Sequence, residues 1–286
     1  MAGDQGLFGD DSVTWRVHVE PIMWIAGLRA LYLQSLHPRV MRGVYQNTEL
    51  FDRKKGWARF LRTARYVAIR TYGTTDETDA AGRRVRAIHA RLTGVDPDTG
   101  ESFRIDEPPL LRWVHCAEIA SYADIARRSG ITTAQETDRY IDENRAGATL
   151  VGLSRDDVPG SMREMTDYFT RQRHRLGATP EGLRGLLNSF NPPLPRHLAA
   201  MRVAVPALNL LALASLPKWA RRMLGIPVLP GADLVTTAQL RALRTATSLT
   251  IGDREEAIAT ARQNAHEMAD GTFVSFLDPK PATIGP

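Results

Sequence analysis

The chain has 286 residues, a formal net charge of +5 and a single cysteine, Cys116. Hydrophobic residues make up 43% of it and charged residues 24%, which supports a packed core and excludes wholesale disorder. One thiol excludes a disulfide framework, a zinc site of four cysteines and an iron–sulfur cluster held by this chain's cysteines. The first eleven residues contain three aspartates and no basic residue. The sequence therefore predicts no secretory signal and a cytoplasmic protein.

Arginine supplies most of the positive charge, with 33 arginines against four lysines. One interpretation is coding bias, and the functional one is recognition of carboxylate or phosphate groups by the planar guanidinium. Because the arginines are spread along the chain, we expect no nucleic-acid partner. The longest apolar stretch, Val203–Leu216, is shorter than the ~20 residues that span a bilayer and contains Pro206 and Asn209. It predicts a core helix and no transmembrane segment, and contact with a membrane or a greasy substrate is the weaker interpretation.

Helical periodicity dominates the chain. The first predicted helix stops at His37-Pro38, because proline disfavours helix in the residue before it. Thr133 and Glu136 have the spacing of a capping box, and Gly130 ends the helix before them. In chain order, helices are predicted over Val17–Leu36, Trp57–Tyr72, Thr75–Leu92, Pro108–Arg128, Thr133–Leu150, Gly160–Arg175, Pro180–Asn188, Pro195–Leu216, Lys218–Leu224, Thr237–Leu249 and Arg254–Ala269.

One β-hairpin is predicted over Val95–Asp106, where Asp98-Thr99-Gly100 forms the turn. The proline-rich joints at Asn191–Pro195 and Gly225–Asp233 are too short to link independent domains. We therefore expect an all-α fold with at most one short hairpin. It forms a single domain over residues 1–277, followed by a loose tail at residues 278–286.

Several kinds of site are excluded by missing motifs. The chain has no GxGxxG, no P-loop and no GxSxG, so dinucleotide, nucleotide and serine-hydrolase sites lack their defining loops. His266 begins a metalloprotease-like helix, but Asp270 stands in place of the second histidine. No Glu-x-x-His occurs, so a ferritin-like di-iron site is excluded too. Cys116 lies beside Trp113 in an apolar helix and reads as an inert core thiol.

Polar residues interrupt the predicted helices at four places. A lone histidine on an apolar face is usually a hydrogen-bonded core residue, and an arginine row is usually solvated. An arginine buried without a partner, however, would need an anion from the protein or from a ligand. The four groups are Gln34 with His37; Arg59, Arg62, Thr63 and Tyr66 on one helix face; His89; and His115 with Glu118 and Tyr122.

Four segments, in this order, resemble one family. They are Leu-Gln-Ser-Leu-His-Pro at Leu33–Pro38, Arg-Phe-Leu-Arg-Thr at Arg59–Thr63, Ile-His-Ala-Arg-Leu-Thr-Gly at Ile88–Gly94 and Leu-Leu-Arg-Trp-Val-His at Leu110–His115. The family is that of latex-clearing proteins and MpaB-type oxygenases, the haem-dependent rubber-oxygenase catalytic domain. The resemblance covers roughly residues 26–168.

The resemblance implies a globin-like helical fold that holds a non-covalent haem b. It implies that His89 is the proximal ligand of the iron and that Arg62 and Thr63 form the distal, catalytic pair. Rubber-cleaving members carry lysine where this chain has Arg62. Since arginine stays protonated and is a poor metal ligand, this departure puts rubber cleavage in doubt.

Further residues are candidates for contacts with the cofactor. Arginine forks would pair with the two haem carboxylates, and Arg59, Arg84 and Arg86 are near enough in sequence to do so. Tyr66 shares the helix face of Arg59 and is a candidate cofactor contact too. A distal arginine could also hydrogen-bond dioxygen or peroxide and stabilise developing charge.

Two histidines remain open between alternatives. His115, which Glu118 one turn later could orient, is the second candidate for the axial ligand and is in any case expected to contact the cofactor. His37 either caps the carbonyls at a helix C-terminus or is a catalytic distal group that titrates near neutral pH.

The function predicted first is a haem-b-dependent oxygenase or oxidase that acts on a hydrophobic small molecule with dioxygen or peroxide. A tailoring step in natural-product synthesis is the expected role. The alternative is a non-catalytic helical protein that binds haem or lipid, and a third hypothesis is a helical protein without cofactor whose histidines are structural.

Overall fold

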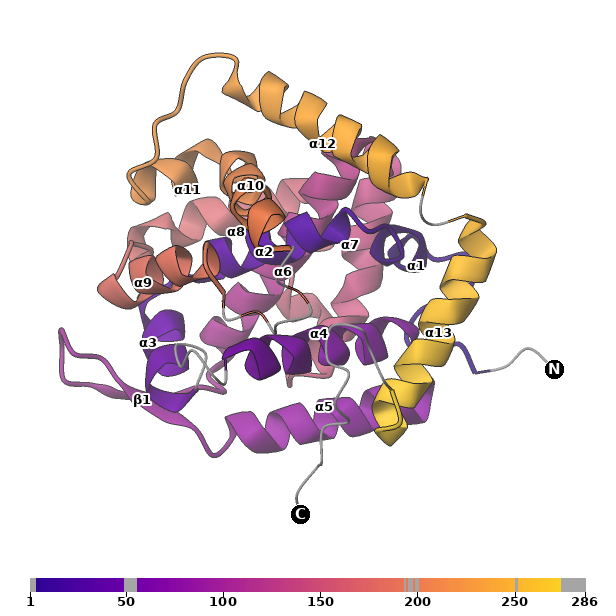
Figure 1. Cartoon of the computed structure of the whole chain (residues 1–286). Coiled ribbons are helices and arrows are strands. Elements are labelled where there is room, and N and C mark those ends of the chain that lie inside the picture. The colour runs from indigo at the N-terminus through magenta and orange to yellow at the C-terminus, as the bar shows by residue number, and fades with distance from the viewer. Residues whose placement is uncertain are drawn as a thin grey trace.

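The computed structural model describes residues 4–48, 56–192, 194, 198, 201–249 and 252–273. Over these residues the chain is built from helices and one two-stranded antiparallel sheet, so the expected all-α class with a short hairpin is confirmed (Figure 1). The loose tail expected at residues 278–286 lies outside the described residues. The elements are α1 Val13–His18, α2 Met23–Gln34, α3 Pro38–Asn47, α4 Gly56–Tyr72, α5 Thr75–His89, β1 Thr93–Val95, β2 Ser102–Arg104, α6 Pro108–Ser129, α7 Ala134–Thr149, η2 Arg155–Asp157, α8 Met162–Gln172, η3 Arg173–Arg175, α9 Pro180–Ser189, α10 Met201–Ser215, α11 Lys218–Met223, α12 Ala232–Ser248 and α13 Arg254–Asp270.

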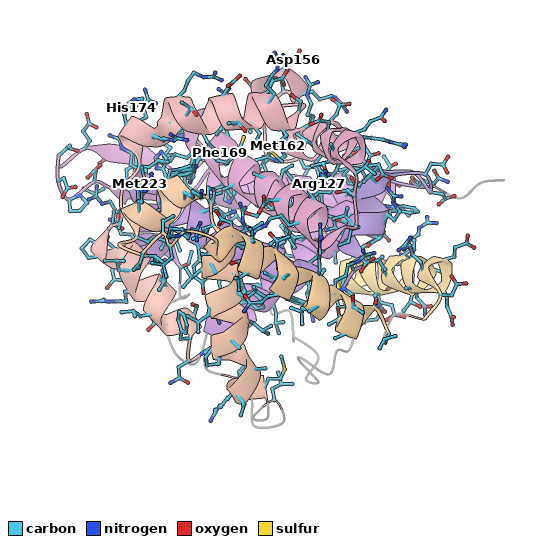
Figure 2. All side chains as sticks on the ribbon, turned by 90° about the horizontal axis from the view of Figure 1, so that it is seen from above. Arg127, Asp156, Met162, Phe169, His174 and Met223 are labelled. Atoms are coloured by element: carbon cyan, nitrogen blue, oxygen red, sulfur yellow. The ribbon has the colours of Figure 1, made fainter. Side chains whose placement is uncertain are left out.

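Helix α6 lies in the middle of the molecule, with α5, α12 and α13 along its outside (Figure 1). Prolines occupy its first positions, where a missing N–H costs nothing, and Gly130 ends it with a φ of 80°. Its alanines, such as Ala117 and Ala123, are fully buried and allow α2 and α7 to pack closely against it. Seen from above, Asp156 and His174 stand at the outer edge of the molecule, whereas Phe169 lies inside (Figure 2).

Helices α4 and α5 form an antiparallel pair. A capping box starts α5: Thr74 accepts from the backbone N–H of Glu77, whose carboxylate accepts from the N–H of Thr74. The end of α4 is tied to α1, because the indole of Trp15 donates to the carbonyl of Thr71 at 2.7 Å and Tyr72 donates back to the carbonyl of Trp15 at 3.1 Å. These bonds fix the position of α4 relative to the central helices.

A small second core holds the C-terminal helix. The buried residues Phe8, Trp15, Tyr72 and Ala265 pack together, and α13 covers α4 there. The guanidinium of Arg262 lies over the Trp15 ring, 4.9 Å from its centroid.

The hairpin packs against α3. Gly94 pairs with Phe103, and a Cβ at Gly94 would lie 2.4 Å from that ring, so only glycine fits there. Arg42 of α3 forms ion pairs with both Asp96 and Asp98 of the turn. The side chain of Arg42 is 7% exposed, which makes this contact a strong orienting link.

Some predicted boundaries were wrong. The apolar stretch Val17–Leu36 is two helices, because Pro21 stands in the turn between α1 and α2. Helix α3 was not predicted at all, although Pro38 opens it at the first turn. Helix α12 begins at Ala232, five residues before the predicted start. The start of the helix predicted over Pro195–Leu216, at residues 195–197, lies outside the described residues, and α10 begins at Met201.

Candidate functional site

One face of α4 carries three of the polar residues that the sequence singled out, together with Arg70, which it did not. Arg59, Thr63, Tyr66 and Arg70 follow one another at spacings of three and four and therefore share a face. At 1.5 Å per residue this row is about 16 Å long. Arg70 is 3% exposed, whereas Thr63, two turns earlier on the same face, is exposed. The face is thus buried at its C-terminal end and open at its N-terminal end.

An ion pair closes the buried end of this row. The guanidinium of Arg70 donates to both carboxylate oxygens of Glu118 on α6, at 2.7 and 3.2 Å. The two side chains are 4% and 17% exposed. Burial opposes the charge of Glu118, but Arg70 outweighs it, and the pKa of Glu118 lies below its usual value. The pair is therefore ionised at neutral pH.

Tyr66 and His115 each lie one helical turn before a member of the ion pair. The hydroxyl oxygen of Tyr66 is buried and has no hydrogen-bond partner among the described residues, and burial raises its pKa. His115 is 7% exposed. Burial lowers the pKa of His115 to about 4, against the opposing effect of Glu118, so the ring is neutral at physiological pH.

His89 lies at the open end. Burial lowers the pKa of its ring, the guanidinium of Arg59 lowers it further and Asp106 opposes them, so His89 lies near both Arg59 and Asp106. Arg59 begins the α4 row and Asp106 immediately precedes α6, so both helices run from His89 toward the ion pair. The buried Nδ1 of His89 has no hydrogen-bond partner within the described part of the chain. We call this set the α4–α6 site: Arg59, Thr63, Tyr66, Arg70, His89, His115 and Glu118.

The predicted arginines divide between this site and the solvent. Arg59 donates to the hydroxyl of Thr63 at 2.6 Å, and Arg86 donates to the carbonyl of Leu150 at 2.8 Å. The charge of Arg86 also reaches Tyr66, whose pKa it lowers. Arg84 is exposed on the other side of α5. Arg62 is exposed too, so it does not need an anion to compensate a buried charge.

His37 lies away from the site. It is the N-cap residue of α3, where its side chain makes no capping bond, and its ring packs 6.0 Å from that of Trp113. Trp113 precedes His115 by two residues and so faces the opposite side of α6. Burial, aided by the charges of Arg39 and Arg175, lowers the pKa of His37 to about 4. In these surroundings the ring therefore does not titrate near neutral pH. Its catalytic role stays a prediction.

The sequence analysis missed two residues, the buried Arg70 of the site and the partly exposed His18 next to it. Arg70 continues the spacing of the α4 row, four residues after Tyr66, and that signal could have found it. His18 stacks on Tyr122 with ring centroids 4.5 Å apart, and its Nε2 lies 3.0 Å from the hydroxyl of Tyr140. Burial lowers the pKa of His18 to about 3. No sequence pattern links it to α6, because it precedes Tyr122 by more than a hundred residues.

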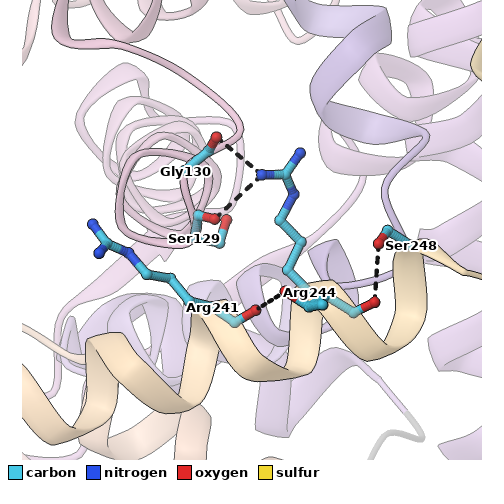
Figure 3. A pocket seen from close by; sticks show the side chains of 6 residues that line it. Ser129, Gly130, Arg241, Arg244 and Ser248 are labelled. Carbon is cyan, nitrogen blue, oxygen red and sulfur yellow. Dashed lines mark hydrogen bonds between the residues drawn. The ribbon is translucent and has the colours of Figure 1, made fainter.

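Two other hollows of the surface have structural explanations. A cavity of about 450 Å³ lies at the far end of α6 and is shown in Figure 3. There Arg244 donates to the carbonyls of Ser129 and Gly130, and Arg241 donates to that of Arg128, so these arginines cap the helix C-terminus. A second cavity, of about 300 Å³, lies between the N-terminal segment and α7. Neither includes a residue of the α4–α6 site.

A family model settles the relationship of the chain to known proteins. It describes the catalytic domain of the ER-bound oxygenase mpaB/B′ and rubber oxygenase, and it matches residues 15–269. The chain belongs to this family. The match extends well beyond the residues 26–168 over which the motifs resemble it, and it makes the protein an oxygenase-type oxidoreductase. No curated protein and no solved structure matches the chain.

The residues of this family member fit a haem in part. A porphyrin iron needs a single protein ligand, and the half-buried His89 has a neutral ring with an unpaired nitrogen beside Arg59. Among the described residues, no three or more histidine, cysteine, aspartate or glutamate side chains lie together in a way that could hold a metal ion. None of the described helices has the length and apolar character needed to cross a membrane.

Proposed function

We propose that the protein is a haem-b-dependent oxygenase or oxidase that acts on a hydrophobic small molecule. The family match over residues 15–269 supports the reaction class. The main support for a haem is His89, whose neutral ring has an unpaired buried nitrogen and lies at the open end of the arginine-bearing face of α4. A haem held there would supply the activation of dioxygen or peroxide.

The chain's own residues have separable roles in this proposal. His89 would hold the iron, and Arg59 and Arg86 would pair with the carboxylates of the cofactor. Arg62 and Thr63 would donate hydrogen bonds to the oxidant and stabilise the negative charge that develops on oxygen. His115 contacts the same site from α6, where the buried ion pair below it prevents the helix from shifting.

The substrate is proposed to be apolar because an apolar surface adjoins the site. Trp24 and Leu31, two turns apart on α2, are 49% and 40% exposed. The ring of Trp24 lies 5.9 Å from that of Phe60, which follows Arg59 on α4. Because Arg62 replaces the lysine of rubber-cleaving members, we propose a tailoring step on a small natural product and not polymer cleavage.

Two measurements test the proposal. The purified chain should show the Soret band of a histidine-ligated haem, and a pyridine haemochrome assay should identify haem b. With the cofactor bound, a candidate apolar substrate should be consumed together with dioxygen or peroxide, and labelled dioxygen separates oxygenase from oxidase. Protein that takes up no haem when reconstituted contradicts the proposal.

A second function is favoured by one observation. On α10, Val203 and Leu210 are 86% and 60% exposed and lie on one face of the helix. Such a surface suits a non-catalytic protein that binds haem or lipid. Haem uptake without any turnover, together with vesicle binding that is lost in Val203→Asp, would favour this alternative.

A further inference from the structure

Tyr66 and His115 of the α4–α6 site make no hydrogen bond within the described residues. The hydroxyl of Tyr66 is fully buried, whereas the ring nitrogens of His115, a residue that is 7% exposed, are not among the fully buried unpaired atoms. In folded proteins more than nine in ten such groups are paired, because leaving one unpaired costs a desolvation penalty. The buried, unpaired hydroxyl of Tyr66 therefore points to a ligand, and the unbonded ring of His115 offers a second hydrogen-bonding group to it.

The two groups lie on the same side of the ion pair. Tyr66 precedes Arg70 by four residues on α4, and His115 precedes Glu118 by three on α6. Both helices run from His89 toward the pair, so both residues lie on the side of the pair that faces His89. The electrostatic effects agree, since Arg70 and Glu118 act on Tyr66 and on His115 alike.

The charge of this place is balanced. The charge of Arg70 is compensated by Glu118, although the buried Nε of Arg70 has no hydrogen-bond partner among the described residues, and the neutral rings of His115 and His18 add no charge. A carboxylate would face Glu118 without a free cation to bond. The nearest uncompensated guanidinium, Arg86, is exposed and donates to the carbonyl of Leu150. A ligand oxygen without charge fits this environment, and a carboxylate fits the arginines at the open end.

We propose that Tyr66 and His115 form a hydrogen-bonding subsite for one uncharged oxygen, a hydroxyl or a carbonyl, of an otherwise apolar substrate. The phenol donates a hydrogen bond to the substrate oxygen, and the neutral imidazole accepts a hydrogen bond from a substrate hydroxyl or donates one from its own N–H. This inference rests on the proposed function and specifies its substrate class as a lipophilic alcohol or ketone.

Binding of three probes that share one skeleton tests the subsite. Toluene, benzyl alcohol and benzoate are measured by equilibrium dialysis against the full chain, both haem-reconstituted and haem-free. We expect benzyl alcohol to bind best. Tyr66→Phe should weaken binding of the alcohol roughly 2- to 12-fold, the range for one net hydrogen bond, and leave toluene unchanged. Tyr45→Phe, in the exposed α3, is the matched control and should change neither.

The role of His115 is tested in the same way. His115→Phe should weaken binding of the alcohol selectively, and His115→Gln, which keeps a hydrogen-bonding side chain, should restore part of it. Equal losses for alcohol and toluene would show a structural role and overturn the subsite. Absence of binding of every probe, or no preference for the alcohol, would also overturn it.

Haem content separates this inference from the proposed function. If Tyr66→Phe loses haem and keeps its preference for the alcohol, the phenol serves a carboxylate of the cofactor and the subsite is wrong. If the chain takes up no haem while Tyr66→Phe selectively loses the alcohol, the proposed function fails and the subsite stands. If the chain takes up haem but shows no preference for the alcohol, the proposed function stands and the subsite fails.

Discussion

Removal of one partner of the Arg70–Glu118 pair should destabilise the protein strongly. Arg70→Met keeps the length of the aliphatic stem and deletes the charge that compensates Glu118. Both side chains are almost buried, at 4% and 17% exposed, and both guanidinium–carboxylate bonds are lost together. A buried charge left without its partner costs about 3–5 kcal/mol. For 286 residues the unfolding entropy makes this roughly 5–8 °C in Tm.

Arg70→Met should also reverse the way in which the stability of the protein depends on pH. In the wild type the pKa of Glu118 lies below its usual value, so its contribution is lost as the pH falls through that lowered pKa. In Arg70→Met burial is the largest remaining influence on Glu118, and it raises the pKa of the carboxyl. The folded variant then binds a proton more tightly than the unfolded chain, so it should become more stable as the pH falls from neutral toward the usual value of 4.5.

Thermal unfolding followed by far-ultraviolet circular dichroism measures both effects. Arg70→Met/Glu118→Leu should recover much of the loss, because it removes the orphaned charge. Arg104→Met breaks a pair whose arginine is 60% exposed and serves as the matched control with little expected change. A Tm and a pH profile equal to those of the wild type in Arg70→Met would refute the reasoning.

The remaining predictions concern the histidines and the distal arginine. His89→Ala should fold and hold little or no haem, and His115→Ala should keep it; the opposite pattern in the Soret band would exchange their roles. Arg62→Ala should retain haem and lose about 2.7–4 kcal/mol of transition-state stabilisation, roughly 10²–10³ in rate, whereas wild-type turnover would remove Arg62 from the site. His37→Gln should lower Tm slightly and leave the rate per haem and its pH profile unchanged, since its pKa of about 4 excludes titration near neutrality; loss of a neutral limb of the profile would contradict this placement.

Local signals in the sequence predicted most of the helices. The capping box of Thr133 and Glu136 and the glycine at 130 stand where the structure has them, because these bonds join residues a few positions apart. Pro21 is an equally local signal for the break between α1 and α2, but the break was overlooked because the residues around Pro21 are mostly apolar. Helix α3 also carries a local signal that was overlooked, since Val40, Met41 and Val44 recur at helical spacing after Pro38. The ion pairs of Arg42 with the hairpin that anchor this helix have no local signal.

The sequence predicts which residues of the candidate site share one helix, but it does not predict which residues of different helices meet. The row on α4 follows from spacing alone, since residues three and four apart share a helix face. That Arg70 meets Glu118 depends on how α4 crosses α6, which no local pattern encodes. The sequence places His37 near the first motif, and tertiary packing moves it to the opposite side of α6, against Trp113.

The packing of α13 on the second core affects how the chain folds while it is being synthesised. The surface of α4 that Ala265 covers lies about 200 residues before its partner in sequence. At about 5–20 residues per second, a ribosome needs roughly 10–40 s to make that stretch. During this interval Trp15 and Tyr72 wait without the helix that shields them, so the nascent chain presents an apolar surface to chaperones. Completion of the packing around the helix that carries the arginine row is thus a late event of co-translational folding.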